Sequence, residues 1–207
     1  MLNVVIDISH HNTVTSFQQI KDNGIVGVFH KATQGRTVVD GEYHARRQRA
    51  LDVGLLWGAY HFGTKGNAAR QVDHFLKTAD PADTDLLVLD FEPNGESGTM
   101  LRSEAEEFVR LIDQYTGRFP GLYSGQSFIR ERIGNNLNTD LKNCFLWIAR
   151  YSSLPPQIPP AWATWTFWQY TDGNAGDQPH QVPGVGRCDR DKFNGSLDGL
   201  KRLWGIA

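Results

Sequence analysis

The chain has 207 residues, 40% of them hydrophobic, and a formal net charge of −2 at pH 7. This size and composition predict one sizeable domain with its own core, covering residues 1–207, since no linker or internal repeat divides the chain. The near-neutral charge gives no electrostatic case for nucleic acid or an anionic membrane as a partner. No apolar run approaches the roughly 20 residues that a membrane-spanning helix needs, so we expect no membrane insertion.

Short apolar runs alternate with helical patterns along the chain. The predicted strands are 3–9, 25–32, 55–63, 85–92, 120–125, 144–151, 164–172 and 185–193, and the predicted helices are 15–23, 40–54, 67–79, 103–117 and 126–133, with a last segment at 196–205. Eight strands, the early ones followed by helices, indicate an α/β fold: a modified parallel (β/α) barrel of the TIM type whose last helices are short or missing. An open α/β sheet is the alternative.

Polar and ionisable residues stand at the ends of most of these strands. They are Asp7, Lys31, Tyr60, His61, Asp90, Glu92, Tyr123, Gln169, Tyr170, Asp189 and Asp191. In a (β/α) barrel the active site is built at the carboxyl ends of the strands. This distribution therefore predicts a site at the barrel mouth, although strand ends also become polar simply because they meet water.

The stretch "LLVLDFEPN" (86–94) carries the strongest signal of this kind. Residues two apart in a strand share a face, so Asp90 and Glu92 point the same way as Leu86 and Val88, whereas Phe91 points to the other face. By the same alternation Asp7 projects inward from the first strand and Asp189 from the last. Carboxyl groups this close raise at least one pKa, which keeps an acid protonated near neutrality.

Two carboxyl groups beside one bond predict glycoside hydrolysis, in which one of them protonates the leaving oxygen. Glu92 is the better candidate for this acid because it lies further along the strand and has the longer side chain. Asp90 is predicted either to orient a substrate group such as an acetamide N–H or to support Glu92. The sequence does not choose between these roles.

Eight segments, spread in order along nearly the whole chain, match the pattern of one known enzyme family. They are "DISHHN", "FHKATQG", "GLLWGAYHF", "LVLDFE", "GLYSG", "LWIARY", "FWQYTDG" and "GVGRCDRDKFNG". Together they resemble the family 25 glycoside hydrolases, lysozymes that cleave peptidoglycan between N-acetylmuramic acid and N-acetylglucosamine. The resemblance implies Glu92 as acid/base, an acidic cluster completed by Asp7, Asp90 and Asp189, and peptidoglycan as the partner. It further suggests attack by the substrate's own acetamide oxygen, with a carboxylate nucleophile as the alternative.

Two positions depart from the family pattern. Gln34 replaces a frequent acidic residue, which puts a peripheral charge in doubt, and Asp191 stands where asparagine is common. We expect Asp191 to bond a loop rather than to join the acidic cluster. The substrate-binding candidates are Lys31, Tyr60, His61, Tyr123, Trp147, Gln169 and Tyr170, each of which could equally serve the barrel's packing or internal hydrogen bonds.

Other functions remain as alternatives at this point. A catalytically inactive sugar-binding barrel would be free to lose the acidic cluster, and a metal-dependent hydrolase would need more histidines than the adjacent pair His10 and His11 provides. We therefore expect no metal and no cofactor, and a monomer without a separate wall-binding domain. The first residues lack the features of a secretory signal, which suggests a phage lysin or a leaderless bacterial enzyme.

Overall fold

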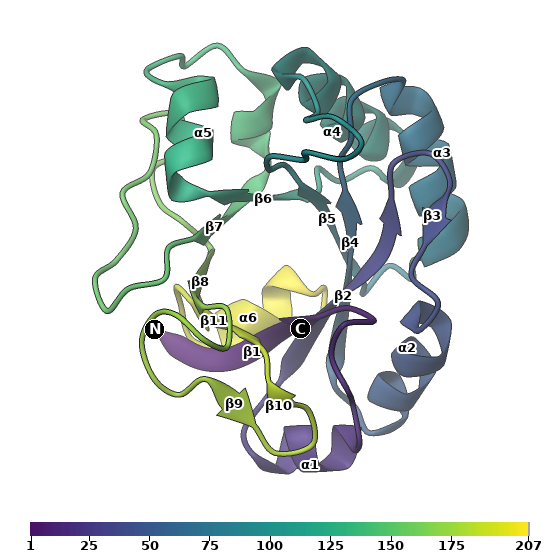
Figure 1. Cartoon of the computed structure of the whole chain (residues 1–207), viewed down its shortest axis with the longest axis vertical. Helices are drawn as coiled ribbons and strands as arrows, with labels where there is room; N and C mark the ends of the chain where they lie inside the picture. Colours follow the sequence, from purple (N-terminus) through teal and green to yellow (C-terminus); the bar gives the residue numbers. More distant parts are fainter. Residues whose placement is uncertain (207) are drawn as a thin grey trace.

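The computed structural model describes residues 1–206, which form one closed barrel (Figure 1). In order around the barrel the strands are β1 (Leu2–Ile8), β2 (Gly27–Gln34), β4 (Leu56–Phe62), β5 (Leu86–Asp90), β6 (Gly121–Gly125), β7 (Phe145–Ala149), β8 (Phe167–Thr171) and β11 (Asp189–Phe193). Pairing of β1 with both β2 and β11 closes the ring. The predicted eight-stranded modified barrel is thus confirmed, and the open sheet is excluded.

The expectation that all eight strands are parallel is wrong for the last one. β11 is antiparallel to both β8 and β1, so its first residue, Asp189, lies level with Asp7 (register Asp7↔Asp189). No helix separates β8 from β11, and a connection without a crossover returns the chain in the opposite direction. Asp189 therefore reaches the mouth from the start of its strand, and Asp191 lies one pleat deeper.

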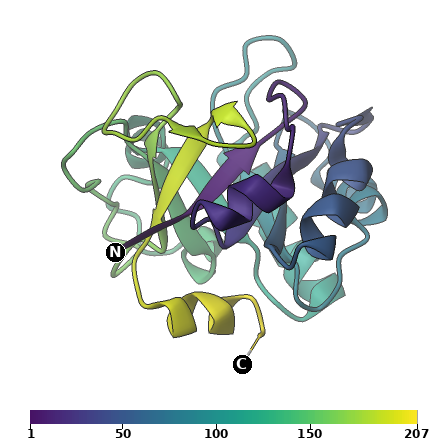
Figure 2. The ribbon, with the colours of Figure 1, turned by 90° about the horizontal axis from the view of Figure 1, so that it is seen from below.

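Helices cover the outside of the first half of the barrel and become sparse afterwards (Figures 1 and 2). They are α1 (Phe17–Asp22), α2 (Tyr43–Asp52), α3 (Ala68–Ala79), α4 (Arg102–Thr116), α5 (Gln126–Ile133), the short 3₁₀ helix η1 (Asp140–Asn143) and α6 (Leu197–Leu203). The short strands β3 (Val38–Val39), β9 (Gln181–Val182) and β10 (Gly186–Arg187) lie in the connections. Within residues 1–206, no helix is both long and apolar enough to cross a membrane.

The barrel interior below the mouth is filled by large apolar side chains. Its core consists of Val5, Phe29, Leu86, Val88, Trp147, Phe167, Phe193, Leu200 and Trp204. Glycine makes room for two of the rings in this region, because a Cβ on Gly58 would come within 2.3 Å of Phe29 and one on Gly121 within 2.2 Å of Phe145. The interior is therefore a packed floor that supports the mouth.

α6 closes the end of the barrel opposite the mouth (Figure 2). Trp204, the residue that follows this helix, is fully buried. The centre of its ring lies 5.4 Å from that of Phe29 and 5.8 Å from that of Phe167. Its indole N–H donates a hydrogen bond to the Trp57 carbonyl at 2.8 Å. We predict that Trp204→Ala lowers the free energy of unfolding by about 3–5 kcal/mol, because it leaves a cavity in this floor. Chemical denaturation measures this, and Ile206→Ala, at an exposed neighbour, serves as the control.

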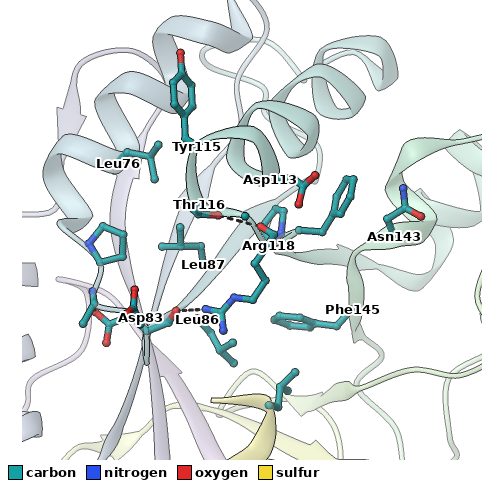
Figure 3. Close-up of a pocket in the computed structure, with 17 residues that line it drawn as sticks. Leu76, Asp83, Leu86, Leu87, Asp113, Tyr115, Thr116, Arg118, Asn143 and Phe145 are labelled. Carbon is teal, nitrogen blue, oxygen red and sulfur yellow. Dashed lines mark hydrogen bonds between the residues drawn. The ribbon is translucent and has the colours of Figure 1, made fainter. Parts of the chain in front are cut away.

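A hollow of about 920 Å³ also lies at this end, between the strand starts and the ends of α3 and α4 (Figure 3). Two of its charged residues are held by neighbours: Arg118 donates to the Asp85 carbonyl at 2.5 Å, and the Asp85 carboxylate pairs with Arg47 at 2.6 Å. These contacts tie the starts of neighbouring elements together. The hollow lies at the opposite end of the barrel from the carboxyl cluster and shares no lining residue with the cavity there.

Candidate active site

A cavity of about 250 Å³ opens at the barrel mouth, where the sequence predicts the site. It is lined by Asp7, Ser9, His11, Lys31, Tyr60, Phe62, Asp90, Glu92, Tyr123, Trp147, Gln169 and Asp189. All four predicted acidic residues are thus brought together from three strands. A neighbouring hollow of about 360 Å³ shares Glu92 and Tyr123 with the cavity, so the open surface continues to one side of Glu92.

Strand alternation positions the acidic pair as expected. Leu86 and Val88 belong to the barrel interior, whereas Leu87, Leu89 and Phe91 pack between the barrel and its helices. Asp90, paired with Phe62 on β4 and Tyr123 on β6, continues the interior face, and Glu92 follows two residues later. The run of apolar residues therefore ends in two carboxyl groups because its inner face reaches the mouth.

Burial raises the pKa values of both members of this pair, and the charge of Glu92 adds to the shift of Asp90. Asp90 is 5% exposed, and its pKa lies well above the usual range, first because of burial and then because of the charge on Glu92. Burial also raises the pKa of Glu92, against the opposing effect of Lys31. Because the two groups are adjacent and interact, we expect the pair to titrate in two steps that belong to both groups. One proton is therefore retained at the mouth well above the pH at which free carboxyl groups lose theirs.

The second pair of carboxyl groups lies across the cavity on β1 and β11. Asp7 accepts a hydrogen bond from Gln169 Nε2 at 2.8 Å, and its pKa is raised by burial and by the nearby charge of Asp191. Burial, followed by the charge of Asp7, raises the pKa of Asp189 to about 9. Both residues thus act as hydrogen-bonding acids near neutral pH.

Lys31 is the one cationic ammonium or guanidinium group among the described residues that line the cavity. Its Nζ donates to Gln34 Oε1 at 2.7 Å and lies 5.1 Å from the centre of the Phe62 ring. Burial lowers its pKa, while the charge of Asp90 opposes that shift. Gln34, which departs from the family pattern, therefore holds the ammonium without neutralising it, and the lysine charge acts on Asp90 and Glu92.

Two predicted substrate-binding residues lie away from the cavity. His61 is fully buried between Thr33, 2.7 Å from its Nδ1, and Gln71, 3.1 Å from its Nε2. Tyr170 is also fully buried, with its hydroxyl 2.8 Å from Asn3 Nδ2 and 3.1 Å from the Pro179 carbonyl. Each is adjacent in sequence to a residue that does line the cavity, so alternation turns it to the outer face of the barrel.

The position of His61 predicts an effect on stability rather than on substrate binding. Burial lowers its pKa to about 3, so it is neutral in the fold but takes up a proton when unfolded below about pH 6.5. This contribution to stability is complete above pH 6.5 and is lost as the pH falls toward 3. We predict that His61→Asn costs ~2 kcal/mol at pH 7 through lost hydrogen bonds, and less at pH 4.

Urea unfolding at pH 7 and pH 4 measures this difference, with His44→Asn, at an exposed position, as the control. A loss of unfolding free energy that is the same at both pH values would contradict a buried, neutral His61. So would a raised KM with unchanged stability.

Several residues of this surface were not predicted from the sequence, and four of them carry polar or aromatic groups that could contact a sugar. Ser9, His11 and Phe62 line the cavity, and Tyr151 lines the neighbouring hollow with its hydroxyl 3.2 Å from Gln169 Oε1. Strand alternation could have found all four, because Ser9 and His11 follow Asp7 at intervals of two, Phe62 follows Tyr60, and Tyr151 follows Trp147 by two such intervals. Like Ser9 and His11, Tyr151 lies just beyond the end of its strand, β7, and keeps the alternation of that strand.

The structure also overturns the expectation that Asp191 bonds a loop. It is fully buried inside the barrel, and its Oδ1 accepts a hydrogen bond from the indole Nε1 of Trp147 at 2.7 Å. Its place on β11 causes this, because Asp191 lies two residues from Asp189 and shares its inward face. Asp191 is therefore a neighbour of the acidic cluster.

A closed α/β barrel with paired carboxyl groups at its mouth is an arrangement suited to glycoside hydrolysis. Residues 6–177 match the family model described as glycosyl hydrolases family 25, and the chain belongs to this family. It is 30% identical to Lysozyme M1 of Streptomyces globisporus, over 96% of this chain and 70% of that protein.

Two solved structures extend the similarity to the whole fold. The bacterial lysozyme from Streptomyces coelicolor has a TM-score of 0.86 and 27% identity, with 100% of this chain and 98% of that chain covered. The muramidase from Acremonium alcalophilum has a TM-score of 0.84 and 30% identity, with 98% of each chain covered.

Proposed function

We propose that the protein is a peptidoglycan muramidase that hydrolyses the β-1,4 link between N-acetylmuramic acid and N-acetylglucosamine. The observation that carries this proposal is the pair Asp90 and Glu92, two buried carboxyl groups with raised pKa values in an open cavity. Similarity to lysozymes and muramidases supports the choice of substrate. The chain would act as a single catalytic domain and as a monomer.

Glu92 is the proposed general acid and base. It is the less buried of the pair and borders both the cavity and the neighbouring hollow, so a sugar on either side can reach it. Its proton passes to the glycosidic oxygen as the bond to the anomeric carbon breaks. The resulting carboxylate then removes a proton from the water that completes hydrolysis.

Asp90 is proposed to orient the substrate's 2-acetamido group. Its Oδ1 is buried and has no hydrogen-bond partner within the described chain, which suits an acceptor for the acetamide N–H. Such a hydrogen bond would direct the acetamide oxygen toward the anomeric carbon as an internal nucleophile. Asp90 would also disfavour ionisation of Glu92, because two like charges at this distance repel each other.

Digestion of purified peptidoglycan tests the proposed function, with borohydride reduction of the products followed by mass analysis. New reducing ends on muramic acid are expected. Reducing ends on glucosamine, or release of free peptides, would contradict the proposal, and an absence of any product would favour an inactive sugar-binding barrel. The same digestion after treatment with a chelator separates this proposal from a metal-dependent hydrolase, since the muramidase should retain its activity.

A further inference from the structure

Asp191 is a buried carboxyl group that the proposed mechanism does not use. Trp147 satisfies its Oδ1, but its Oδ2 is buried without a hydrogen-bond donor in the described chain. A carboxylate oxygen left in this state costs free energy, so such an atom calls for a partner. The side chain that offers one is Asp7, which lies within hydrogen-bonding reach.

The strand register explains this contact. Asp191 pairs with Val5 on one side and Gln169 on the other, so it lies one pleat below Asp7 on the same inner face. The side-chain amide of Gln169, the neighbour of Asp191 on β8, donates an N–H to Asp7. Two carboxyl groups in this arrangement form a hydrogen bond only when one of them carries a proton, because neither has another donor to offer.

We infer that Asp191 is a positioning residue of the active site. Its carboxylate accepts a hydrogen bond from the protonated carboxyl group of Asp7 and so keeps Asp7 uncharged at the mouth. The inference rests on the proposed function, in which the mouth must bind a sugar beside Asp90 and Glu92. The negative charge is held at the floor of the cavity, beneath the substrate.

The groups around the two carboxyls favour this placement of the proton. Burial raises the pKa of Asp191 well above its usual range, and the charge of Asp189 adds to this shift. Hydrogen bonds from the Trp147 N–H and from Asp7, and the charge of the neighbouring Arg190, act the other way and favour the anion of Asp191. Burial and the charge of Asp191 raise the pKa of Asp7, and its hydrogen bond to Asp191 raises it further. Hydrogen bonds from the Gln169 amide and from the protonated Asp189 lower it, and no cationic group within residues 1–206 acts on it as Arg190 acts on Asp191. The proton is therefore held better on Asp7, with Asp191 as its acceptor.

Asp191→Asn tests this inference because the amide keeps the shape of the carboxyl group. Its oxygen can still accept from Trp147, and its N–H₂ can donate to Asp7, which then ionises at neutral pH. The negative charge moves up to the mouth and raises the pKa values of the Asp90–Glu92 pair. Both limbs of the pH profile of kcat/KM should move to higher pH, by about one unit.

A second readout does not depend on activity. The slope of the unfolding free energy against pH gives the number of protons that the folded protein holds beyond the unfolded one. Near pH 7 this number should fall by about one in Asp191→Asn. Asp85→Asn, which removes a buried carboxyl group at the opposite end of the barrel, is the matched control and should move neither limb of the profile.

An unchanged pH profile and proton count in Asp191→Asn would overturn the inference and reduce Asp191 to a support for Trp147. A variant that fails to fold would overturn it too, because the amide provides every hydrogen bond that the inference assigns. A wild-type protein without activity on peptidoglycan would refute the proposed function, while the proton count would still decide the role of Asp191.

Discussion

Glu92→Gln should abolish turnover of peptidoglycan, with kcat lowered about 10³-fold, while the fold and its stability are retained. The amide has nearly the shape of the carboxyl group but has no acidic proton to give to the leaving oxygen. Loss of a raised, buried carboxyl group should leave stability at neutral pH unchanged or slightly higher. Release of reducing ends measures the activity, and thermal unfolding measures the stability.

Glu96→Gln is the matched control for this variant. Glu96 is an exposed carboxylate that lies four residues further along the same loop, outside the cavity. Its substitution should leave kcat and KM unchanged. A Glu92→Gln enzyme that keeps more than a tenth of the wild-type rate would contradict the assigned role of Glu92.

Asp90→Asn should lower kcat by about 10²-fold with a smaller change in KM, because the lost interaction acts mainly while charge develops at the anomeric centre. It should also move the alkaline limb of the pH profile to lower pH. In the wild type the two carboxyl groups retain one proton between them, whereas in Asp90→Asn Glu92 titrates alone, so its proton is lost at a lower pH.

The pH dependence of kcat and kcat/KM on soluble peptidoglycan fragments checks this prediction. An Asp90→Asn enzyme with a tenfold higher KM and an unchanged kcat would show that Asp90 contributes only to binding. An alkaline limb that stays in place would show that Asp90 does not affect the proton on Glu92.

The barrel and its acidic mouth were predictable because they depend on local patterns. Alternation along β5 places Asp90 and Glu92 together, and the strand spacing predicts both the barrel and the loss of its late helices. The direction of β11 was not predictable in this way, since a short strand reads the same in either direction. Only the absence of a helix between β8 and β11 indicates the antiparallel return, and with it the depth of Asp191.

The binding residues illustrate a different limit. The sequence prediction included both members of two adjacent pairs, Tyr60 with His61 and Gln169 with Tyr170, although neighbours on a strand face opposite sides. The structure places one member of each pair at the cavity and buries the other. The contact of Asp7 with Asp191 depends on the register between β1 and β11, which no single segment of sequence encodes.

The central claim is that this barrel mouth retains carboxyl protons near neutral pH and uses one of them for glycosidic cleavage. Titration of the Asp and Glu side-chain carboxyl carbons by ¹³C NMR, with Glu92→Gln and Asp189→Asn used to assign the signals, tests the first part directly. We expect the signal of Asp189 to titrate near pH 9, and the Asp90–Glu92 pair to titrate in two coupled steps, with the second step above the range of free carboxyl groups. A spectrum in which every carboxyl group titrates below about pH 5 would contradict the account.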